Sequence, residues 1–203
     1  MSAPPDTVLE VDEAEAEAIR NAVRTADPLT LGYGRMLARP EHAAALAHFF
    51  ADPRVSGAIY DLPRPFTAEV MNTWILESEA LRQEGRRLLI LTFDETAQLV
   101  GYSCITVWPE RSAAELAGAI RADRQNEGQG GAGAIHSFGW VFDTLGVRMM
   151  GLTAAVDNVR SARLIDAAGF TRMGERDSVR PDGTVRRSLY WEMMAEDWKA
   201  RWG

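Results

Sequence analysis

A glycine-rich turn beyond the middle of the chain is the stretch whose residue types could bind an anion. Residues 124–133 read RQNEGQGGAG, and apolar residues then recur at helical spacing: Ile135, Phe138, Val141, Phe142 and Leu145. The start of a helix carries backbone N–H groups without intrahelical partners and the positive end of the helix dipole. Because glycine has no Cβ, a ligand can approach this backbone closely. The stretch predicts a phosphate site, and a flexible surface turn is the alternative.

The order of elements around the turn and the spacing of its glycines help to distinguish between known kinds of phosphate site. A strand-like run, residues 113–120, precedes it, so the order is strand, glycine turn, helix. Dinucleotide-binding turns of this order have the spacing G-x-G-x-x-G at the first strand of a βαβ unit. Here the spacing is Gln125-x-x-Gly128-x-Gly130, more than halfway along the chain, and the lysine of a P-loop is absent.

A second motif follows the first. Residues 157–170 read DNVRSARLIDAAGF, with an asparagine that leads a helix and Gly-Phe after it. Together the two motifs resemble the GNAT family of acetyl-CoA-dependent N-acetyltransferases. The Asn-x-x-Ser form and the N-terminal half of the chain resemble its RimJ/RimL-like branch. The resemblance extends from about Leu31 to Trp198, and the pair of motifs at this separation is its most specific part.

The resemblance implies a binding site for acetyl-CoA as the acyl donor. It implies that N–H groups of the turn contact the pyrophosphate and that the backbone of the preceding strand holds the pantetheine arm and points an N–H at the thioester carbonyl. Such a donor can be worth ~3 kcal/mol. The implied donor-binding residues are Ile120, Arg121, Ala122, Gln125, Asn126, Glu127, Gly128, Gln129, Gly130, Gly131, Asn158 and Ser161. For Asn158 the alternative is a helix N-cap, which Ser161 could reinforce, and both roles can hold at once.

Two positions bear on proton transfer. Many family members carry a tyrosine seven residues after the asparagine, as general acid for the thiolate. Here that position is Ile165, which fits the RimJ/RimL-like branch because its members often lack the tyrosine. The thiol of CoA ionises near ~8.5, so it can leave unprotonated or take a proton from water or the amine. Glu115, the only carboxylate in the middle of its strand, is our candidate base, because an amine of pKa ~10 is protonated at neutral pH. The alternative is an exposed strand residue.

Other reactive or aromatic side chains have mainly structural interpretations. No histidine is placed beside Cys104 by pattern, so we expect this thiol in the core or lining a cleft. Tyr190 and Trp191 also favour the core. The few cysteines and histidines are too scattered for a metal site, and none is expected. Four aromatic residues could line an acceptor cleft, although core packing explains most of them: Tyr60, Phe66, Trp74 and Trp108.

Composition limits the class of protein. With 203 residues, 46% of them apolar, the chain can bury a core, and one domain is expected. The net charge of −7 gives no help toward nucleic acid and weakly favours cationic acceptors such as amines. No apolar run is long enough to cross a bilayer, and the first residues do not resemble a signal peptide. With a single cysteine, these features favour a cytoplasmic protein.

Hydrophobic periodicity predicts the elements. We expect an N-terminal extension, 1–30, with disorder over 1–9 and a short helix over 11–25, which is an added element, a homodimer contact or a frayed arm. The resemblance implies that residues 31–203 form a single GNAT-like domain. Its strands are expected at 35–40, 88–93, 99–108, 113–121, 149–156, 171–180 and 184–194, with helices at 41–51, 67–84, 158–169, after the glycine turn and at the C-terminus. Residues 52–66 are expected to form a proline-broken loop.

These elements predict an α/β (α+β) fold. It has a mixed, mostly antiparallel seven-stranded sheet, helices on both faces and one parallel strand pair at the CoA site. The expected activity is transfer of an acetyl group to a primary amine, on a small molecule or a peptide N-terminus, directly in a ternary complex. Two alternatives remain: a GNAT-like module that binds CoA without catalysis, and an unrelated phosphate-binding domain. Ribosomal-protein N-termini, amino acids, polyamines and aminoglycosides are all open as acceptors.

Overall fold

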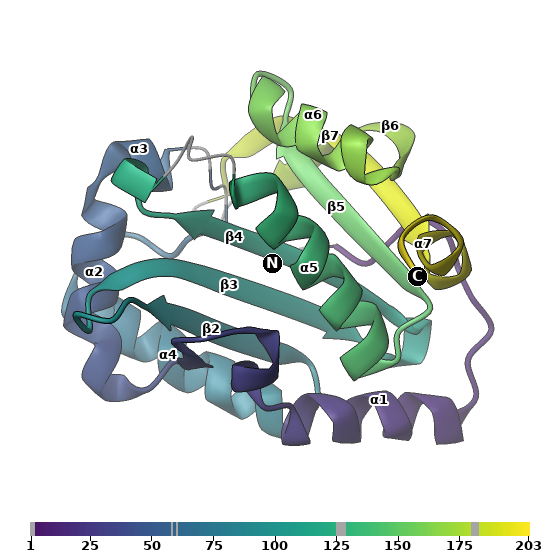
Figure 1. Cartoon of the computed structure of the whole chain (residues 1–203), viewed down its shortest axis with the longest axis horizontal. Coiled ribbons are helices and arrows are strands. Elements are labelled where there is room, and N and C mark those ends of the chain that lie inside the picture. Colours follow the sequence, from purple (N-terminus) through teal and green to yellow (C-terminus); the bar gives the residue numbers. More distant parts are fainter. Residues whose placement is uncertain (1–2, 58, 60, 125–128, 180–182) are drawn as a thin grey trace.

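The protein is built on one seven-stranded sheet in the computed structural model, which describes residues 3–57, 59, 61–124, 129–179 and 183–203. The strands lie in the order β1-β2-β3-β4-β5-β7-β6, and only β4 and β5 run parallel (Figure 1). Their bounds are β1 Arg35–Leu37, β2 Arg87–Phe93, β3 Leu99–Trp108, β4 Ala113–Ile120, β5 Met149–Ala155, β6 Thr171–Val179 and β7 Val185–Met194. The predicted fold class, with its single parallel pair, is confirmed.

Helices cover both faces of the sheet, each over its own core. On the face seen in Figure 1, α5 Gln129–Leu145 lies over the centre of the sheet. α6 Val159–Ala168 lies toward its β7 and β6 side, and α7 Ala195–Trp202 packs beside α5. On the opposite face, α2 Ala43–Ala51 and α4 Ala68–Gln83 cover β2 and β3, and α3 Pro53–Ser56 forms inside the segment expected to be a loop. None of the described helices is both long and apolar enough to span a membrane.

The first helix, α1 Glu13–Thr25, buries one face against the main core. Ile19 and Val23 lie in the same apolar cluster as α5, and the Asp12 side chain caps the helix by accepting the N–H of Glu15. Acidic residues in the first turn and Arg24 in the last match the helix dipole. The predicted helix therefore exists and packs on the body of the protein along the edge shown in Figure 1.

The segment before α1 also contacts the sheet. Disorder is expected for residues 1–9 from the sequence, yet residues 3–7 lie against β5 and β7 and accept or donate several hydrogen bonds. Pro5 is buried, and further along the chain the Arg148 side chain donates to the carbonyl of Glu10. The chain from Ala3 to α1 is therefore part of the packed structure.

Candidate active site

The parallel pair at the centre of the sheet opens after a short stretch of pairing. β4 and β5 pair only from Ala113 with Met149 to Glu115 with Gly151. Beyond this point β4 continues to Ile120 and β5 to Ala155, and these two fully described strands pair no further with each other. Exposure follows the separation: β4 is buried up to Glu115, whereas Gly118 and Ile120 are exposed. The two strands therefore stop pairing beyond Glu115 and Gly151, and the unpaired stretch between them is called the opening below.

One edge of this opening is lined by backbone groups of β4. Arg121 donates its N–H to the carbonyl of Val100 at 2.8 Å, so its backbone faces β3. Because successive residues of a strand point their N–H and C=O groups to opposite sides, the amides of Leu116, Gly118 and Ile120 point toward the β5 side. Of the predicted stretch 120–122, Ile120 is thus the residue whose amide faces the opening.

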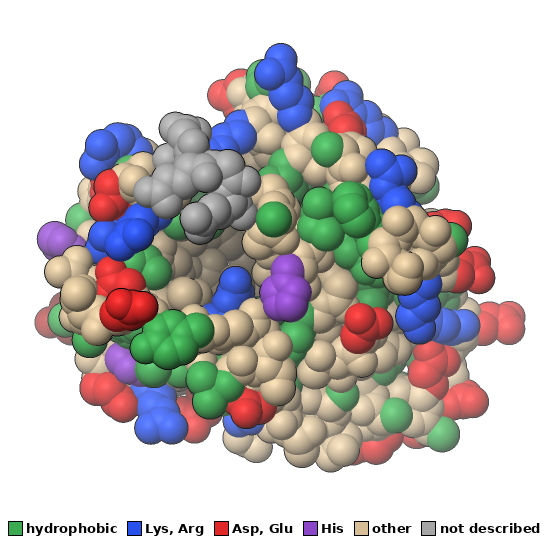
Figure 2. Space-filling model, viewed as in Figure 1, with side chains coloured by type: hydrophobic (Ala, Val, Ile, Leu, Met, Phe, Trp, Pro, Cys, Tyr) green, Lys and Arg blue, Asp and Glu red, His purple; other side chains and the backbone are tan. Residues whose placement is uncertain are grey.

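Two helices begin at the end where the strands separate. α5 begins at Gln129, and β5 leads through a tight turn into α6 (Figure 1). In the first turns of α5, a Cβ added to Gly131 or Gly133 would lie more than 4 Å from every described atom outside its own stretch of the helix, so the described residues leave space beside this backbone. The residues 125–128, predicted to contact pyrophosphate, lie outside the described part of the chain. Figure 2 shows a hollow in this face of the molecule, beside α5.

Asn158 is the N-cap of α6, as one of its two interpretations predicts. Its Oδ1 accepts the N–H of Ser161 at 3.1 Å, and Gly169 ends the helix with φ +96°. Asn158 and Ser161 are both partly exposed, at the end of β5 where it has separated from β4. The cap orients the asparagine at the rim of the opening, and its side-chain NH2 group is not needed for capping.

Glu115 lies at the point where β4 and β5 begin to separate, on the face opposite α5. Its strand neighbours Ala114 and Leu116 belong to the core beneath α5, so Glu115 points the other way. Its side chain is only 8% exposed, which rules out the alternative of an exposed strand residue. The Thr153 hydroxyl on β5 donates to Glu115 Oε1 at 2.8 Å, a contact that the sequence did not predict because it joins two strands far apart in the chain.

The remaining predicted residues have defined surroundings. Ile165 is buried in the core beneath α6, so the position of the family's tyrosine faces inward. Arg121 holds Asp123 and Gln98 with its guanidinium, at 2.7 Å and 3.0 Å. Ala122 lies in the 3-10 turn after β4.

The thiol and phenol that were expected in the core lie there. Burial raises the pKa of the Cys104 thiol to about 12, so it is not a nucleophile at neutral pH. Tyr190 is buried, and its hydroxyl donates to Glu192 Oε1. Burial and that carboxylate raise the pKa of the phenol.

The aromatic residues considered for an acceptor cleft are mostly core residues. Phe66 and Trp74 pack around Phe50, with ring centroids 5.7 Å and 6.1 Å from it, beneath α2 and α4. Trp108 ends β3, and Tyr60 lies outside the described residues. Core packing, the alternative interpretation, therefore accounts for Phe66 and Trp74.

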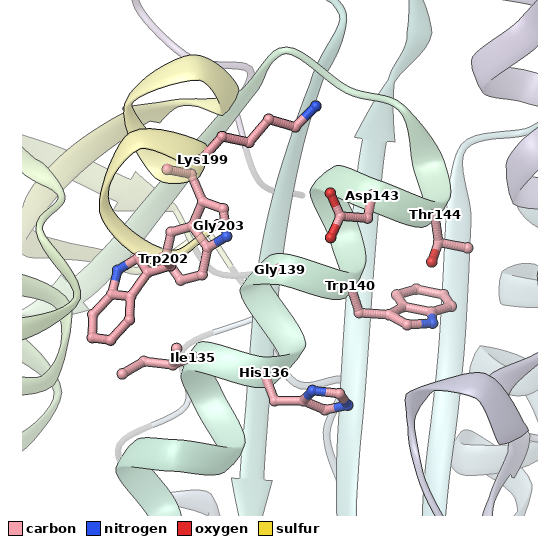
Figure 3. Close-up of a pocket in the computed structure, with 10 residues that line it drawn as sticks. Ile135, His136, Gly139, Trp140, Asp143, Thr144, Lys199, Trp202 and Gly203 are labelled. Carbon is pink, nitrogen blue, oxygen red and sulfur yellow. The ribbon is translucent and has the colours of Figure 1, made fainter.

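A separate pocket of about 370 Å³ lies between α5 and α7 (Figure 3). His136, Trp140 and Asp143 line it from α5, and Lys199 and Trp202 from α7. Nε2 of the His136 ring lies 3.1 Å from the carbonyl oxygen of Leu31. No residue of β4 or α6 lines this pocket, so it is distinct from the opening in the sheet.

Comparison with known proteins identifies the family. Residues 35–171 match the acetyltransferase (GNAT) domain, which covers more than half of the chain, and the chain therefore belongs to the GNAT acetyltransferases. The family predicted from the two motifs is confirmed. No match was found among curated proteins.

Solved structures of acetyltransferases share the fold. Ribosomal-protein-S5-alanine acetyltransferase from Vibrio fischeri is 18% identical, with a TM-score of 0.68 over 81% of this chain and 93% of that one. RimJ from Mycobacterium smegmatis, in complex with CoA-disulfide, is 16% identical, with a TM-score of 0.68 over 80% and 82%. A GNAT acetyltransferase from Streptococcus pneumoniae is 18% identical, with a TM-score of 0.58 over 79% and 98%. These neighbours include proteins of the predicted RimJ/RimL-like branch.

Proposed function

We propose that this GNAT acetyltransferase transfers an acetyl group from acetyl-CoA to a primary amine, directly in a ternary complex. The observation that carries the proposal is the opening between β4 and β5. The starts of α5 and α6 flank it on one face of the sheet, and the buried carboxylate of Glu115 lies beside it on the other. A donor that enters from the helix side can present its acyl group to an acceptor on the opposite side.

The donor would be held mainly by backbone. The N–H groups of residues 126–131 would bind the pyrophosphate, because helix-start amides are unpaired and Gly131 leaves room for phosphate oxygens. The amides of β4 that face the opening, at Gly118 and Ile120, would bind the pantetheine arm and the thioester carbonyl. The side-chain amide of Asn158 would bind the arm from the β5 side, with Ser161 next to it. When bound, acetyl-CoA supplies the activated acyl group.

Proton transfer would fall to Glu115. An acceptor amine is almost fully protonated at neutral pH and must lose a proton before it can attack a carbonyl. The Thr153 hydroxyl orients the Glu115 carboxylate, which would take that proton directly or through a water molecule. Because Ile165 points into the core, the thiolate of CoA would leave without a proton from that position.

The acceptor class is proposed to be a primary amine on a small molecule or at a peptide N-terminus. The structural neighbour from Vibrio fischeri is named as a ribosomal-protein-S5-alanine acetyltransferase, which supports a peptide N-terminus among the candidates. The net charge of −7 would also favour a cationic acceptor, weakly and in a salt-dependent way.

The test compares Glu115→Gln with the native protein, with Glu110→Gln as control. Glu110 precedes β4, is paired with Arg86 at the surface and does not line the opening. We expect kcat/KM with acetyl-CoA and a responsive amine to fall about 10–100-fold near neutral pH in Glu115→Gln only, with a smaller loss as the pH approaches the pKa of the amine. Full activity of Glu115→Gln across this range would contradict the assignment of the base. Binding of CoA without acetyl-CoA consumption, over a broad panel of amines, would instead support the non-catalytic module.

A further inference from the structure

The N-terminal segment Ala3–Thr7, here called the strap, lies on the face of the sheet that carries Glu115. Its residues contact Gly151, Tyr190 and Glu192 of β5 and β7. Gly151 and Thr153 share a face of β5, and Thr153 donates to Glu115, so strap and carboxylate are on the same side. None of the sequence motifs anticipates this position.

Side chains from three parts of the fold hold the strap by its backbone. Glu192 accepts the N–H of Thr7 at 3.0 Å and also its hydroxyl, and the Tyr190 hydroxyl accepts the N–H of Asp6 at 3.2 Å. Arg111, just before β4, donates to the carbonyl of Pro5 at 2.8 Å.

The third anchor is Arg176 on β6. It reaches over the Tyr190 ring at 3.8 Å and donates to the carbonyls of Pro4 and Ala3, at 3.4 Å and 3.3 Å. Anchors spaced along the whole strap give it one defined path over the sheet.

The strap passes close to the candidate base. A Cβ added to Gly151 would lie 3.3 Å from Cγ of Pro5, so the proline ring rests directly on this glycine. Gly151 is the strand partner of Glu115, at the last paired position before β4 and β5 separate. Pro5 therefore stands beside the carboxylate on its β5 side.

On the same face of the sheet, other elements cover the β3 side of β4. There α2 and α4 pack over β2 and β3, and α3 contacts β4. Ala119 of β4 packs against the apolar cluster beneath α2 and α4. β4 thus lies between two covers, the strap on the β5 side and α3 on the β3 side. An acceptor that approaches Glu115 would have to enter between them.

We propose that the strap forms one wall of the acceptor-binding site and selects acceptors by the size of the group next to the amine. This inference rests on the proposed function and adds the element that determines specificity. Residues outside the two sequence motifs hold this wall. Glu192 binds Thr7, and Arg176 binds the carbonyls of Ala3 and Pro4. Release of the strap widens the site on the β5 side and leaves the donor side, beneath α5 and α6, unchanged.

The experiment uses the full chain with the double substitution Thr7→Val and Arg176→Met. The matched control carries Thr25→Val and Arg187→Met. Thr25 forms a hydrogen bond within α1. Arg187 on β7 pairs with Glu175 and Asp177, which flank Arg176 on β6. None of these contacts of Thr25 or Arg187 is with the strap. Hydrogen exchange at the amides of Asp6 and Thr7 first reports whether the strap is released. Steady-state kinetics with acetyl-CoA and tripeptides beginning with glycine, alanine, leucine or tryptophan then reports selectivity.

In the strap variant we expect hydrogen exchange at Asp6 and Thr7 to accelerate about tenfold or more. We also expect kcat/KM for the tryptophan peptide, relative to that for the glycine peptide, to rise about tenfold. The KM for acetyl-CoA should stay within about twofold, and the control should match the native protein. Unchanged exchange would refute the anchors, and faster exchange with an unchanged ratio would refute the wall. Turnover of no peptide by either protein, with CoA still bound, would also overturn it. Absence of CoA binding to the native protein in calorimetry would be the distinct failure of the proposed function, and the wall would fall with it.

Discussion

Substitution of Asn158 by alanine and by aspartate separates two roles that one side chain can perform. Oδ1 caps α6 through the N–H of Ser161 at 3.1 Å, whereas the NH2 group is not used by the cap. Alanine removes both groups. Aspartate keeps a capping oxygen, adds a negative charge at the positive end of the helix, and removes only the NH2 donor.

The expected stability changes follow from the cap. Loss of an N-cap costs ~1 kcal/mol, which lowers the Tm of a domain of about this size by about 2–4 °C. Three residues of α6, Ala162, Ile165 and Ala168, remain buried in the core, so the helix stays folded in Asn158→Ala. The free energy of unfolding of Asn158→Asp should lie within about 0.5 kcal/mol of the native value.

Affinity for CoA should follow the NH2 group rather than the cap. Loss of one hydrogen bond worth ~1 kcal/mol raises Kd about fivefold, and we expect this for both variants in isothermal titration calorimetry. Thermal unfolding should therefore show a lower Tm for Asn158→Ala alone, whereas calorimetry should show weaker CoA binding for both variants. Native CoA affinity in Asn158→Asp would refute the proposed contact and leave Asn158 as a cap only.

Three further predictions concern the donor site, the core and the strap. Gly131→Ala should keep or raise Tm, because the added Cβ meets no described atom outside its own helix and alanine favours a helix by up to ~1 kcal/mol. Calorimetry should show CoA affinity falling about tenfold, and unchanged affinity would remove Gly131 from the site. Ile165→Ala should lower the free energy of unfolding by ~2–5 kcal/mol in denaturant titrations, and a changed shape of the kcat–pH profile in the folded fraction would contradict a purely packing role. Burial would raise the pKa of Glu192, but hydrogen bonds from Thr7 and Tyr190 outweigh it and hold the pKa below 4.5. This carboxylate therefore stabilises the fold above pH 4.5 and loses that effect as the pH falls through its lowered pKa, so the stability deficit of Glu192→Gln at neutral pH should shrink in acid; a constant deficit would refute the linkage.

Local chemistry in the sequence determined the elements and the family. The alternation of apolar residues predicted the seven strands, and their helical spacing predicted the helices. Asn158 marked the start of α6 because its side chain can cap a helix, and Gly169 marked the end because glycine adopts a positive φ. The glycine turn and the asparagine-led helix carried the resemblance that the family match over residues 35–171 confirms. These signals can be recognised in the sequence because each depends on residues only a few positions apart.

Tertiary structure alone decided what surrounds the candidate site. Thr153 meets Glu115, and the segment that composition marked as disordered lies across β5 and β7, bound by Glu192 and Arg176. These contacts join residues from distant parts of the chain and depend on strand order, register and facing. None of these has a local pattern in the sequence. Pro5 has the sequence surroundings of a loose terminus, yet its ring lies against Gly151, where a Cβ would come within 3.3 Å of it. The parallel pairing sets this glycine beside Glu115.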